Sequence, residues 1–316
     1  MPTISAALRI VFMGTPDFAV PSLRVLINGP DRVVGVVCQP DRKRGRGRKL
    51  AHPPIKVLAL EHKISVLQPE RITTSDFFNT VQTLAPDLIV VVAYGKMLPG
   101  SLLNLPRYGA INVHGSLLPK YRGAAPVQWA ILNGEQETGV TVMQMDEGMD
   151  TGDILYPVSI AIEETDTTGS LCLKLAEAGA TALIEAVDLL KQRKLAPLPQ
   201  DNTLATSAPM LTKEQGHIDW SQSAQSIHCT IRGLDPWPSA YSFLDGKRFR
   251  FFHPERVAKP ALEVPGSVCQ ADANGLLIAT GTEYLRILEL QPEGKKRMDV
   301  QACLCGNRIT PGSIFS

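Results

Sequence analysis

Polar side chains gather at the end of one apolar stretch in the middle of the chain. Asn112 and His114 lie in the segment 111–119, which reads as the end of a buried strand that runs into a loop. Because alternate residues of an extended strand share a face, the amide and the imidazole are predicted to project to the same side. Gly115 follows at once and allows the backbone to turn. An amide beside an imidazole could stabilise a developing negative charge and move a proton.

A second polar cluster follows at residues 146–153, after one helix-like and one strand-like segment. It contains Asp146, Asp150 and Asp153, of which Asp150 lies between two glycines. If this cluster returns to the same edge of a sheet, a carboxylate joins the amide and the imidazole. Those three groups suffice for acid–base chemistry with charge stabilisation. Asp153 is expected to cap the turn or to begin the next strand, a use for which aspartate is well suited.

The elements predicted around these clusters alternate between strand and helix. The predicted strands are 8–13, 33–38, 87–93, 108–113, 138–145 and 154–162, and the predicted helices are 18–27, 54–61, 76–84, 125–133 and 169–193. The strand at 87–93 is apolar on both faces, which is typical of the centre of a parallel sheet covered on each side. The alternation predicts a doubly wound, Rossmann-like α/β domain, in which ligands bind at the carboxyl ends of the strands. The first turn, at 14–17, lacks the GxGxxG pattern of a dinucleotide site.

The composition changes after residue 194. The segment 195–211 holds three prolines, has little periodicity and is nearly uncharged, so it is predicted to be a linker. Beyond it, a helix is predicted at 221–234, and short strands are predicted at 240–244, 247–252, 266–270, 276–279 and 284–290. Short strands joined by glycine turns indicate a small OB-like β-barrel, a fold that commonly binds oligonucleotides. The predicted domains are therefore 1–194 and 212–316, joined by the linker.

Composition excludes several classes of protein. The chain has 316 residues and a formal net charge of +1, so the whole molecule is not drawn to a polyanion or a membrane surface. Its six cysteines form neither a disulfide framework nor the paired CxxC pattern of a zinc site. No apolar run reaches the length of a membrane span, and the first residues do not resemble a secretory signal. We expect a soluble, cytoplasmic protein without a metal, and nothing requires more than a monomer.

One short segment departs from this neutral balance. Residues 41–49 read DRKRGRGRK and carry the basic side chains Arg42, Lys43, Arg44, Arg46, Arg48 and Lys49. A charge run of this kind is usually a solvated, disordered loop. Arginine can also bind phosphate through two parallel hydrogen bonds, and the glycines would let the loop adapt to a nucleic acid. We expect a segment that becomes ordered when RNA binds.

These motifs together resemble the folate-dependent formyltransferases. The likeness rests on NVHGSLLP at 112–119, RGAAP at 122–126, GMDTGD at 148–153, GTPDF at 14–18, VVVAYG at 90–95, DPWP at 235–238 and LQPEGKK at 290–296. It extends over nearly the whole chain. The segment 302–316 departs from the family pattern because it is shortened and rich in cysteine, which leaves the last barrel strand unpredicted.

The resemblance implies that the first domain is a formyltransferase domain and that the barrel binds tRNA. The implied reaction moves the formyl group of 10-formyltetrahydrofolate, a co-substrate, to the α-amino group of methionyl-initiator tRNA for translation initiation. Matching by motif places Asn112, His114 and Asp150 at the catalytic positions. The folate is then expected against Tyr94, Gly95, Ser116, Leu117, Leu118 and Pro119. The tRNA is expected at the six basic residues of 41–49, with further basic residues of the barrel extending the contact.

Three other functions stay open at this point. A formyltransferase acting on a small amine, such as glycinamide ribonucleotide or an amino sugar, would share the Asn, His and Asp set but would need neither basic loop nor barrel. A hydrolase that removes formate from the folate could use the same three groups with water. A non-catalytic RNA-binding protein on a Rossmann-like scaffold is disfavoured by the intact set Asn112, His114 and Asp150.

Overall fold

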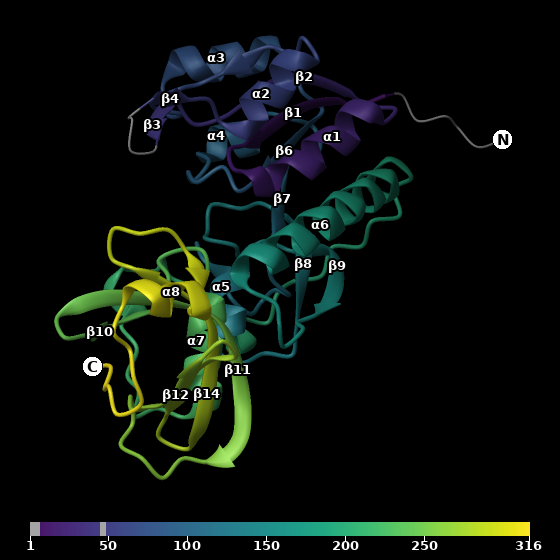
Figure 1. The fold of residues 1–316 in the computed structure, drawn as a ribbon. Helices are drawn as coiled ribbons and strands as arrows, with labels where there is room; N and C mark the ends of the chain where they lie inside the picture. The colour runs from purple at the N-terminus through teal and green to yellow at the C-terminus, as the bar shows by residue number, and fades with distance from the viewer. Residues whose placement is uncertain (1–6, 45–48) are drawn as a thin grey trace. The chain divides into compact units, whose positions relative to one another are not determined.

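The computed structural model of the protein describes residues 7–44 and 49–316, which divide into two compact units (Figure 1). The first unit extends to Pro126 and also includes Thr138–Ile160 and Cys172–Ala208. The second unit comprises Val127–Glu137, Ala161–Leu171 and Pro209–Ser316. The chain thus passes between the two units several times. None of the helices in the described ranges is both long and apolar enough to cross a membrane.

A mostly parallel sheet forms the centre of the first unit. Its strands follow the order β5-β2-β1-β6-β7-β8-β9. They are β1 (Arg9–Gly14), β2 (Arg32–Val37), β5 (Val66–Leu67), β6 (Leu88–Val92), β7 (Ala110–His114), β8 (Glu137–Gln144) and β9 (Ile154–Ala161). The helices are α1 (Val20–Asn28), α2 (Pro54–Glu61), α3 (Ser75–Thr83), α4 (Gly100–Leu103) and most of α6 (Thr168–Lys191), with a short 3₁₀ helix η1 (Asp17–Ala19). Helix α5 (Pro126–Leu132) follows β7 in the chain and, apart from Pro126, groups with the second unit. The predicted doubly wound α/β fold is confirmed.

The sheet is buried because its central strands are apolar on both faces. Every residue of β6 is buried, as expected for a strand at the centre of a parallel sheet. On one face, Phe77 and Val81 of α3 pack in one cluster with Val11 and Met13 of β1. On the other, Gly179 of α6 lies so close to the sheet that a Cβ there would be 2.9 Å from Val113 Cγ1. The two helix layers fix β7 and its polar end.

The strand after β7 runs in the opposite direction. β1 pairs in parallel with β2 and β6, and β6 pairs in parallel with β7, but β8 pairs antiparallel with β7. The alternation of strand and helix along the chain did not predict this reversal. Its consequence is that Thr141 of β8 lies opposite His114 and accepts a hydrogen bond from Leu118 N at 3.1 Å, which ties the loop after β7 to the sheet.

The second unit contains a six-stranded antiparallel sheet. Its path is β10-β11-β14-β13-β12, and β15 pairs with β14. The elements are β10 (Tyr241–Leu244), β11 (Lys247–Pro260), β12 (Val268–Asp272), β13 (Gly275–Ala279), β14 (Glu283–Pro292), β15 (Met298–Asp299), α7 (Ala224–Gly233), α8 (Val300–Gly306) and the 3₁₀ helix η3 (Glu214–Gly216). A further 3₁₀ helix, η2 (Asn202–Leu204), belongs to the first unit. The predicted strands are all present.

Strand β11 is longer than the predicted 247–252, although it contains prolines. It pairs with β14 from Phe249 to Pro260, whereas β10 covers its other edge only from Lys247 to Arg250. A proline lacks the N–H that a ladder requires, so it is tolerated on the edge that has no partner strand. Pro254 lies beyond the part that β10 covers, and the extension past 252 follows from this one-sided pairing.

The final residues pack into the second unit. Phe315 is buried, with its ring centroid 5.1 Å from that of Phe251 and 5.7 Å from that of Phe249. Ile314 forms an antiparallel bridge with Ser267. Although no strand was predicted in 302–316, this segment includes most of α8 and then helps to close the apolar core.

The segment predicted as a linker makes ordered contacts with the first unit. Leu198 and Ile154 exchange both backbone hydrogen bonds, at 2.8 and 2.9 Å. Arg122 N donates to Thr206 O at 2.8 Å, and Ala208 N donates to Arg122 O at 2.7 Å. The domain boundaries 1–194, 195–211 and 212–316 stay a prediction from composition.

Candidate functional site

The carboxyl ends of five parallel strands lie along one edge of the first unit. β2 and β5 lie on one side of β1, while β6 and β7 lie on the other. The direction in which strands are added therefore reverses between β1 and β6. In open α/β sheets a ligand binds in the crevice outside the strand ends at such a reversal. A binding pocket is therefore expected between the segments that leave β1 and β6.

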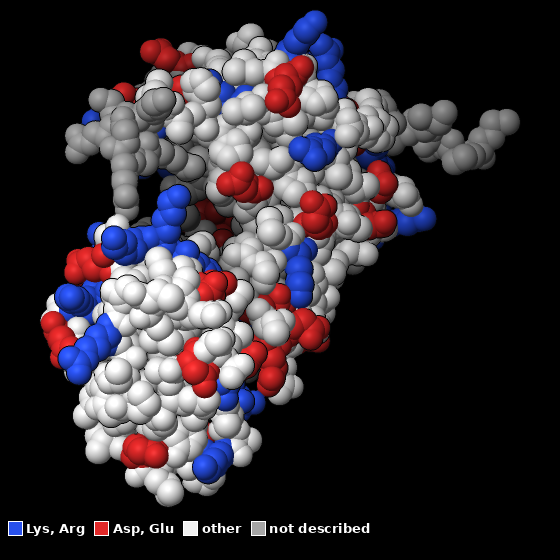
Figure 2. Space-filling view, in the orientation of Figure 1, with Lys and Arg blue, Asp and Glu red and all other residues white. Residues whose placement is uncertain are grey.

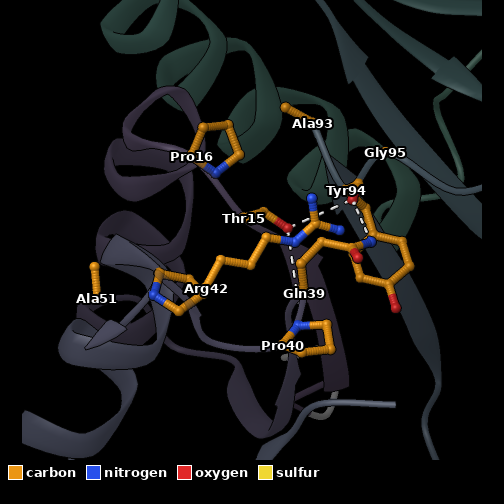
Figure 3. Close-up of a pocket in the computed structure, with 10 residues that line it drawn as sticks. Thr15, Pro16, Gln39, Pro40, Arg42, Ala51, Ala93, Tyr94 and Gly95 are labelled. Carbon is orange, nitrogen blue, oxygen red and sulfur yellow. Dashed lines mark hydrogen bonds between the residues drawn. The ribbon is translucent and has the colours of Figure 1, made fainter. Parts of the chain in front are cut away.

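A pocket of about 340 Å³ lies at this reversal (Figure 3). Thr15 and Pro16 line it after β1, and Ala93, Tyr94 and Gly95 line it after β6. Its remaining lining residues are Gln39, Pro40, Arg42, Ala51 and Pro53. Two of the predicted folate residues, Tyr94 and Gly95, therefore belong to this pocket.

Hydrogen bonds hold the walls of the pocket together. Gln39 Nε2 and Thr15 Oγ1 donate to Tyr94 O at 3.1 and 3.4 Å, so the segments after β1, β2 and β6 are joined at one carbonyl. The Tyr94 hydroxyl is buried and has no hydrogen-bond partner among the described residues. Burial, with a smaller contribution from Cys38, raises the pKa of Tyr94 to about 12. Tyr94 therefore stays neutral and shapes the wall.

His114 lies at the end of β7, the strand beside β6. Its side chain is 6% exposed, and Nε2 lies 2.9 Å from Tyr121 O. Since a carbonyl oxygen only accepts, Nε2 must carry a hydrogen. The other nitrogen, Nδ1, faces Asp150 Oδ2 at 3.7 Å. That separation is too long for a hydrogen bond and short enough for an ion pair with a protonated imidazole.

Asp150 reaches His114 from the loop between β8 and β9. Its backbone is left-handed, with φ of 55°, and its Oδ2 accepts a hydrogen bond from Gly123 N at 2.8 Å. Gly152 allows the loop to close, because a Cβ there would lie 1.9 Å from Gln144 O. The two polar clusters that the sequence singled out, more than thirty residues apart, therefore lie together.

The other acidic residues of this loop have local roles. Asp146 Oδ1 accepts hydrogen bonds from Gly148 N at 3.0 Å and from Thr151 Oγ1 at 2.7 Å. Asp153 accepts through its backbone from Gln144 N at 2.9 Å, which joins the ends of the loop. Among the three aspartates, Asp150 is the one whose carboxylate faces the imidazole.

Asn112 lies two residues before His114 on β7 and is partly exposed. Within the part of the chain that the structure describes, its side-chain amide has no hydrogen-bond partner. An amide at a strand end without an internal partner is available to a bound molecule.

The remaining folate prediction, Ser116 to Pro119, falls in the loop after β7 and does not line the 340 Å³ pocket. Ser116 is buried, and its Oγ donates to Lys120 O at 2.6 Å. Thr141 Oγ1 donates to Ser116 O at 2.7 Å. Leu118 is also buried. The contacts found here are internal, so folate contact by these four residues stays a prediction.

Two short strands, β3 (Arg42–Arg44) and β4 (Lys49–Ala51), lie at the two ends of the basic segment and pair antiparallel as a hairpin. Arg42 is exposed and lines the pocket. Arg46 and Arg48 lie outside the described residues, and so do the side chains of Lys43, Arg44 and Lys49. Contact of these residues with tRNA stays a prediction.

Asp41 anchors the root of this hairpin. Its Oδ2 accepts from Lys56 Nζ at 2.7 Å and faces His52 Nδ1 at 2.8 Å, and its Oδ1 accepts from Gln68 Nε2 at 2.8 Å. The hydrogen bonds from Lys56 and then from Gln68 lower the pKa of Asp41 to about 2. The carboxylate is therefore charged at neutral pH. Its hydrogen bonds fix Asp41, the residue that directly precedes Arg42.

Sequence reasoning missed two glutamines that join separate segments. Gln39 links the pocket walls, and Gln200 links the loop of Asp150 to Arg122. Neither residue belongs to a motif, and Gln200 lies in the segment predicted as a linker. Their partners are far away in the sequence, so no local pattern points to them. Within the described residues, no group of three or more His, Cys, Asp or Glu side chains could hold a metal ion.

Comparison with known proteins agrees with this fold and defines the family. The family model described as formyl transferase matches residues 8–187, and the model of the formyl transferase C-terminal domain matches residues 210–308. The chain therefore belongs to the formyl transferase family.

Two curated relatives are similar to this chain along nearly its whole length. A curated protein of Desulfotalea psychrophila is 55% identical over 309 residues, which cover 98% of this chain and 96% of the relative. One of Caldanaerobacter subterraneus subsp. tengcongensis is 51% identical over 309 residues, or 98% of this chain and 100% of the relative. Both are named methionyl-tRNA formyltransferase.

A solved structure supports the fold alone. An N-formyltransferase from Helicobacter canadensis, in complex with folinic acid and dTDP-3-aminofucose, has a TM-score of 0.66 and 17% identity, covering 92% of this chain and 100% of its own. That structure shares the fold at low identity, so it says nothing about which acceptor this chain uses.

Proposed function

We propose that the chain transfers the formyl group of 10-formyltetrahydrofolate to the α-amino group of methionyl-initiator tRNA. The observation that carries this proposal is the identity of 55% along 98% of the chain with a methionyl-tRNA formyltransferase. The reaction belongs to translation initiation and therefore to the cytoplasm. Asn112, His114 and Asp150 all come from one chain, which agrees with a monomer.

In the proposed reaction the free amine attacks the formyl carbon directly. The new C–N bond forms, the carbonyl oxygen becomes negative, and the bond from carbon to N10 of the folate then breaks. The amine loses a proton and N10 gains one. An α-amino group titrates near pH 8, so about a tenth of it is already neutral at pH 7. No covalent intermediate with the protein is required.

Asn112 and His114 are the proposed donors to the negative oxygen. The Asn112 amide has no internal hydrogen-bond partner among the described residues. Because His114 Nε2 donates to Tyr121 O, the nitrogen left for the reaction is Nδ1. Removing one donor of this kind from an acyl-transfer site lowers the rate by about 10²–10³-fold.

Asp150 is proposed to orient His114 and to relay the proton. Its Oδ2 lies 3.7 Å from Nδ1, where a carboxylate stabilises a positive charge on the imidazole. With a water molecule it can carry the proton from the attacking amine to N10. Positioned proton transfer of this kind contributes about 10²–10⁴-fold.

The folate is proposed to bind in the pocket at the strand reversal. The pocket lies beside the end of β7, because β6, whose exit lines it, pairs with β7 through Val91 and Asn112. Neighbouring strands are about 4.8 Å apart, so a donor held there could present its formyl group to His114. The loop 116–119 is proposed as a further wall on the basis of the family resemblance.

The tRNA is proposed to contact the basic segment 41–49 and the second unit. On the face drawn in Figure 2, Lys and Arg gather over the β10–β11 hairpin and the loop after β14. Lys247, Lys295 and Lys296 are exposed there. Arg297 has a different role, because its guanidinium lies 4.0 Å over the Phe252 ring and pairs with Asp235 and Glu289. The three lysines are therefore the better candidates for phosphate contacts.

The experiment that tests this function is an assay with two classes of acceptor. The purified chain is incubated with 10-formyltetrahydrofolate and either methionyl-initiator tRNA or small amines, including an amino sugar nucleotide. The product is measured by mass. We expect an increase of one formyl group on the aminoacyl-tRNA and none on the small amines. Formylation of small amines alone, or release of formate without an acceptor, would overturn the proposal.

A further inference from the structure

Residues 198–208 connect two loops that flank the proposed catalytic pair. At the start, Leu198 pairs with Ile154 just after the Asp150 loop. At the end, Thr206 accepts from Tyr121 N through its hydroxyl at 2.8 Å and from Arg122 N through its carbonyl at 2.8 Å. The segment is thus attached by its backbone at both ends, and what lies between its ends can bridge the two loops.

The side chain of Gln200 makes that bridge. Its Nε2 donates to Asp150 O at 2.9 Å and to Gly152 O at 2.6 Å. Its Oε1 accepts from Arg122 Nε at 3.0 Å and from Arg122 Nη2 at 2.7 Å. Both donor hydrogens and both acceptor sites of the amide are in use. A side chain that is partly buried and fully bonded in this way has one preferred orientation.

The two ends of this bridge act on the same pair of side chains. On one side it fixes the backbone of Asp150, which is held in a left-handed conformation beside Gly152. On the other side it fixes Arg122, which lies between the carbonyl that accepts from His114 Nε2 and the N–H that donates to Asp150 Oδ2. The distance between His114 and Asp150 therefore depends on two loops that Gln200 joins.

We propose that Gln200 is a positioning residue for formyl transfer, acting through Asp150. This inference rests on the proposed function, because it assumes that Asp150 takes part in the reaction. Gln200 is not needed to hold the segment in place, since Leu198, Thr206 and Ala208 bind the first unit through their own hydrogen bonds. Loss of the Gln200 side chain therefore loosens the Asp150 loop and leaves the surrounding fold intact.

Two substitutions separate the donor and acceptor sides of the bridge. Q200E keeps an acceptor for Arg122 and loses both donors to the Asp150 loop. Q200M has a similar length and loses all four hydrogen bonds. Each is measured alone and combined with D150A, by steady-state kinetics and by single turnover with excess enzyme. Thermal unfolding of each variant reports whether it is folded.

We expect Q200E and Q200M to lower kcat by about tenfold to a hundredfold, the usual effect of a small misplacement of a reacting group. The KM values for both substrates should stay within about threefold, because Gln200 does not line the pocket. In the D150A background neither substitution should lower kcat further by more than about twofold, since residues that act through one another are not additive. If Q200E does not fold, Q200M alone gives the same comparison.

Asn202 provides the matched control. It lies on the same segment, and its Oδ1 also accepts from Arg122 Nη2, at 2.9 Å, but none of its hydrogen bonds goes to the Asp150 loop. We expect N202A to keep kcat within about twofold, because the bridge to Asp150 remains.

Four results would overturn the proposal. The first is a kcat within twofold of the wild type for both Q200E and Q200M, and the second is an equal loss of kcat with and without D150A. The third is a loss of kcat in Q200M while folded Q200E keeps the wild-type kcat. The fourth is a wild-type kcat in D150A itself. A wild-type chain that does not formylate methionyl-tRNA at all would instead refute the proposed function, so the two failures are distinguishable.

Discussion

The two ring nitrogens of His114 have different surroundings, and this difference decides which of them can react. Nε2 donates to the Tyr121 carbonyl, whereas Nδ1 faces Asp150. Only Nδ1 can change its protonation without losing a hydrogen bond. The ring is therefore oriented by one loop toward a carboxylate that comes from another.

His114→Gln tests this assignment because it retains one nitrogen position and removes the other. The glutamine amide can still donate to Tyr121 O, but it lacks Nδ1. We expect kcat to fall by about 10²–10³-fold, with a thermal midpoint near that of the wild type and a tRNA Kd within a few fold. Kinetics, thermal unfolding and tRNA binding measure the three quantities.

The exposed His62, at the end of α2, provides the control, and His62→Ala should keep the wild-type kcat. A His114→Gln enzyme that turns over at the wild-type rate would remove the imidazole from the reaction.

Asp150 and Asp146 form a matched pair within one loop. Asp150→Asn removes the charge that faces His114, and we expect kcat to fall by about 10²–10⁴-fold. Asp146→Asn leaves an oxygen that can still accept from Gly148 N and Thr151 Oγ1, so kcat should remain within about threefold. The comparison is made by single-turnover assay. Equal losses in the two variants would mean that the loop needs negative charge in general, not a carboxylate at position 150.

Part of this site could be predicted from the sequence, and the reason is local geometry. Strand alternation alone placed Asn112 and His114 on one face. The meeting of Asp150 with His114 follows from a shared sheet edge, which fold class implies. Gln200 could not be predicted, because its role depends on where residues 198–208 lie in space. The catalytic and binding roles themselves stay predictions.

At the scale of elements, the hydrogen bonds of Asp41 connect the basic hairpin to α2 and to the segment after β5. Asp41 is bound by Lys56 of α2 and by Gln68 after β5, and Arg42 follows it directly. The orientation of Arg42 in the pocket therefore depends on a carboxylate of opposite charge.

Asp41→Ala gives a result whose sign distinguishes anchoring from charge. If charge alone governed tRNA binding, removing an acidic residue would strengthen it. We expect binding to weaken by about fivefold, because the hairpin loses charge-assisted hydrogen bonds at its root. Filter binding of tRNA at fixed salt measures the Kd. The control is Glu61→Gln, an exposed acid at the end of α2, for which tRNA binding should be unchanged or tighter. Tighter binding by Asp41→Ala would contradict the anchoring role.

The periodicity of apolar residues predicted most elements within a few residues of their observed bounds. It failed where an element depends on its neighbours. The direction of β8 is set by pairing with β7, and β11 continues past residue 252 by pairing with β14. The basic segment was predicted to be a disordered loop, yet its two arms pair as β3 and β4. Partners of this kind are not visible in a local window of sequence.

At the scale of the whole molecule, the pattern of short strands and glycine turns after residue 211 predicted a second fold of β-strands, and an antiparallel sheet is present there. It could not indicate that Val127–Glu137 and Ala161–Leu171 group with that second unit. Those segments are short, and they resemble the rest of the first half in composition. A linker was predicted from prolines and weak periodicity, which say nothing about the backbone hydrogen bonds that residues 198–208 make.

The second unit contains a buried base that ties its stability to pH. His228 is 4% exposed on α7, and its Nδ1 accepts a hydrogen bond from Arg232 Nε at 3.2 Å. Burial, and then the nearby charges of Arg232 and Arg256, lower the pKa of His228 to about 4, although Glu164 acts in the opposite direction. The folded protein therefore keeps this histidine neutral at pH values where an unfolded chain would protonate it.

The expected consequence is a loss of stability as the pH falls from about 6.5 to about 4. In this range the unfolded state binds a proton that the folded state does not, so the free energy of unfolding decreases by up to about 1.4 kcal/mol per pH unit. Above pH 6.5 His228 is neutral in both the folded and the unfolded state, so it no longer makes the free energy of unfolding depend on pH. His228→Asn retains an acceptor for Arg232 and has no titrating group, so its thermal midpoint should depend less on pH across the same range. Because carboxylates titrate in both proteins, the difference between the two slopes is the quantity to compare, and identical slopes would mean that His228 is accessible to protons in the folded state.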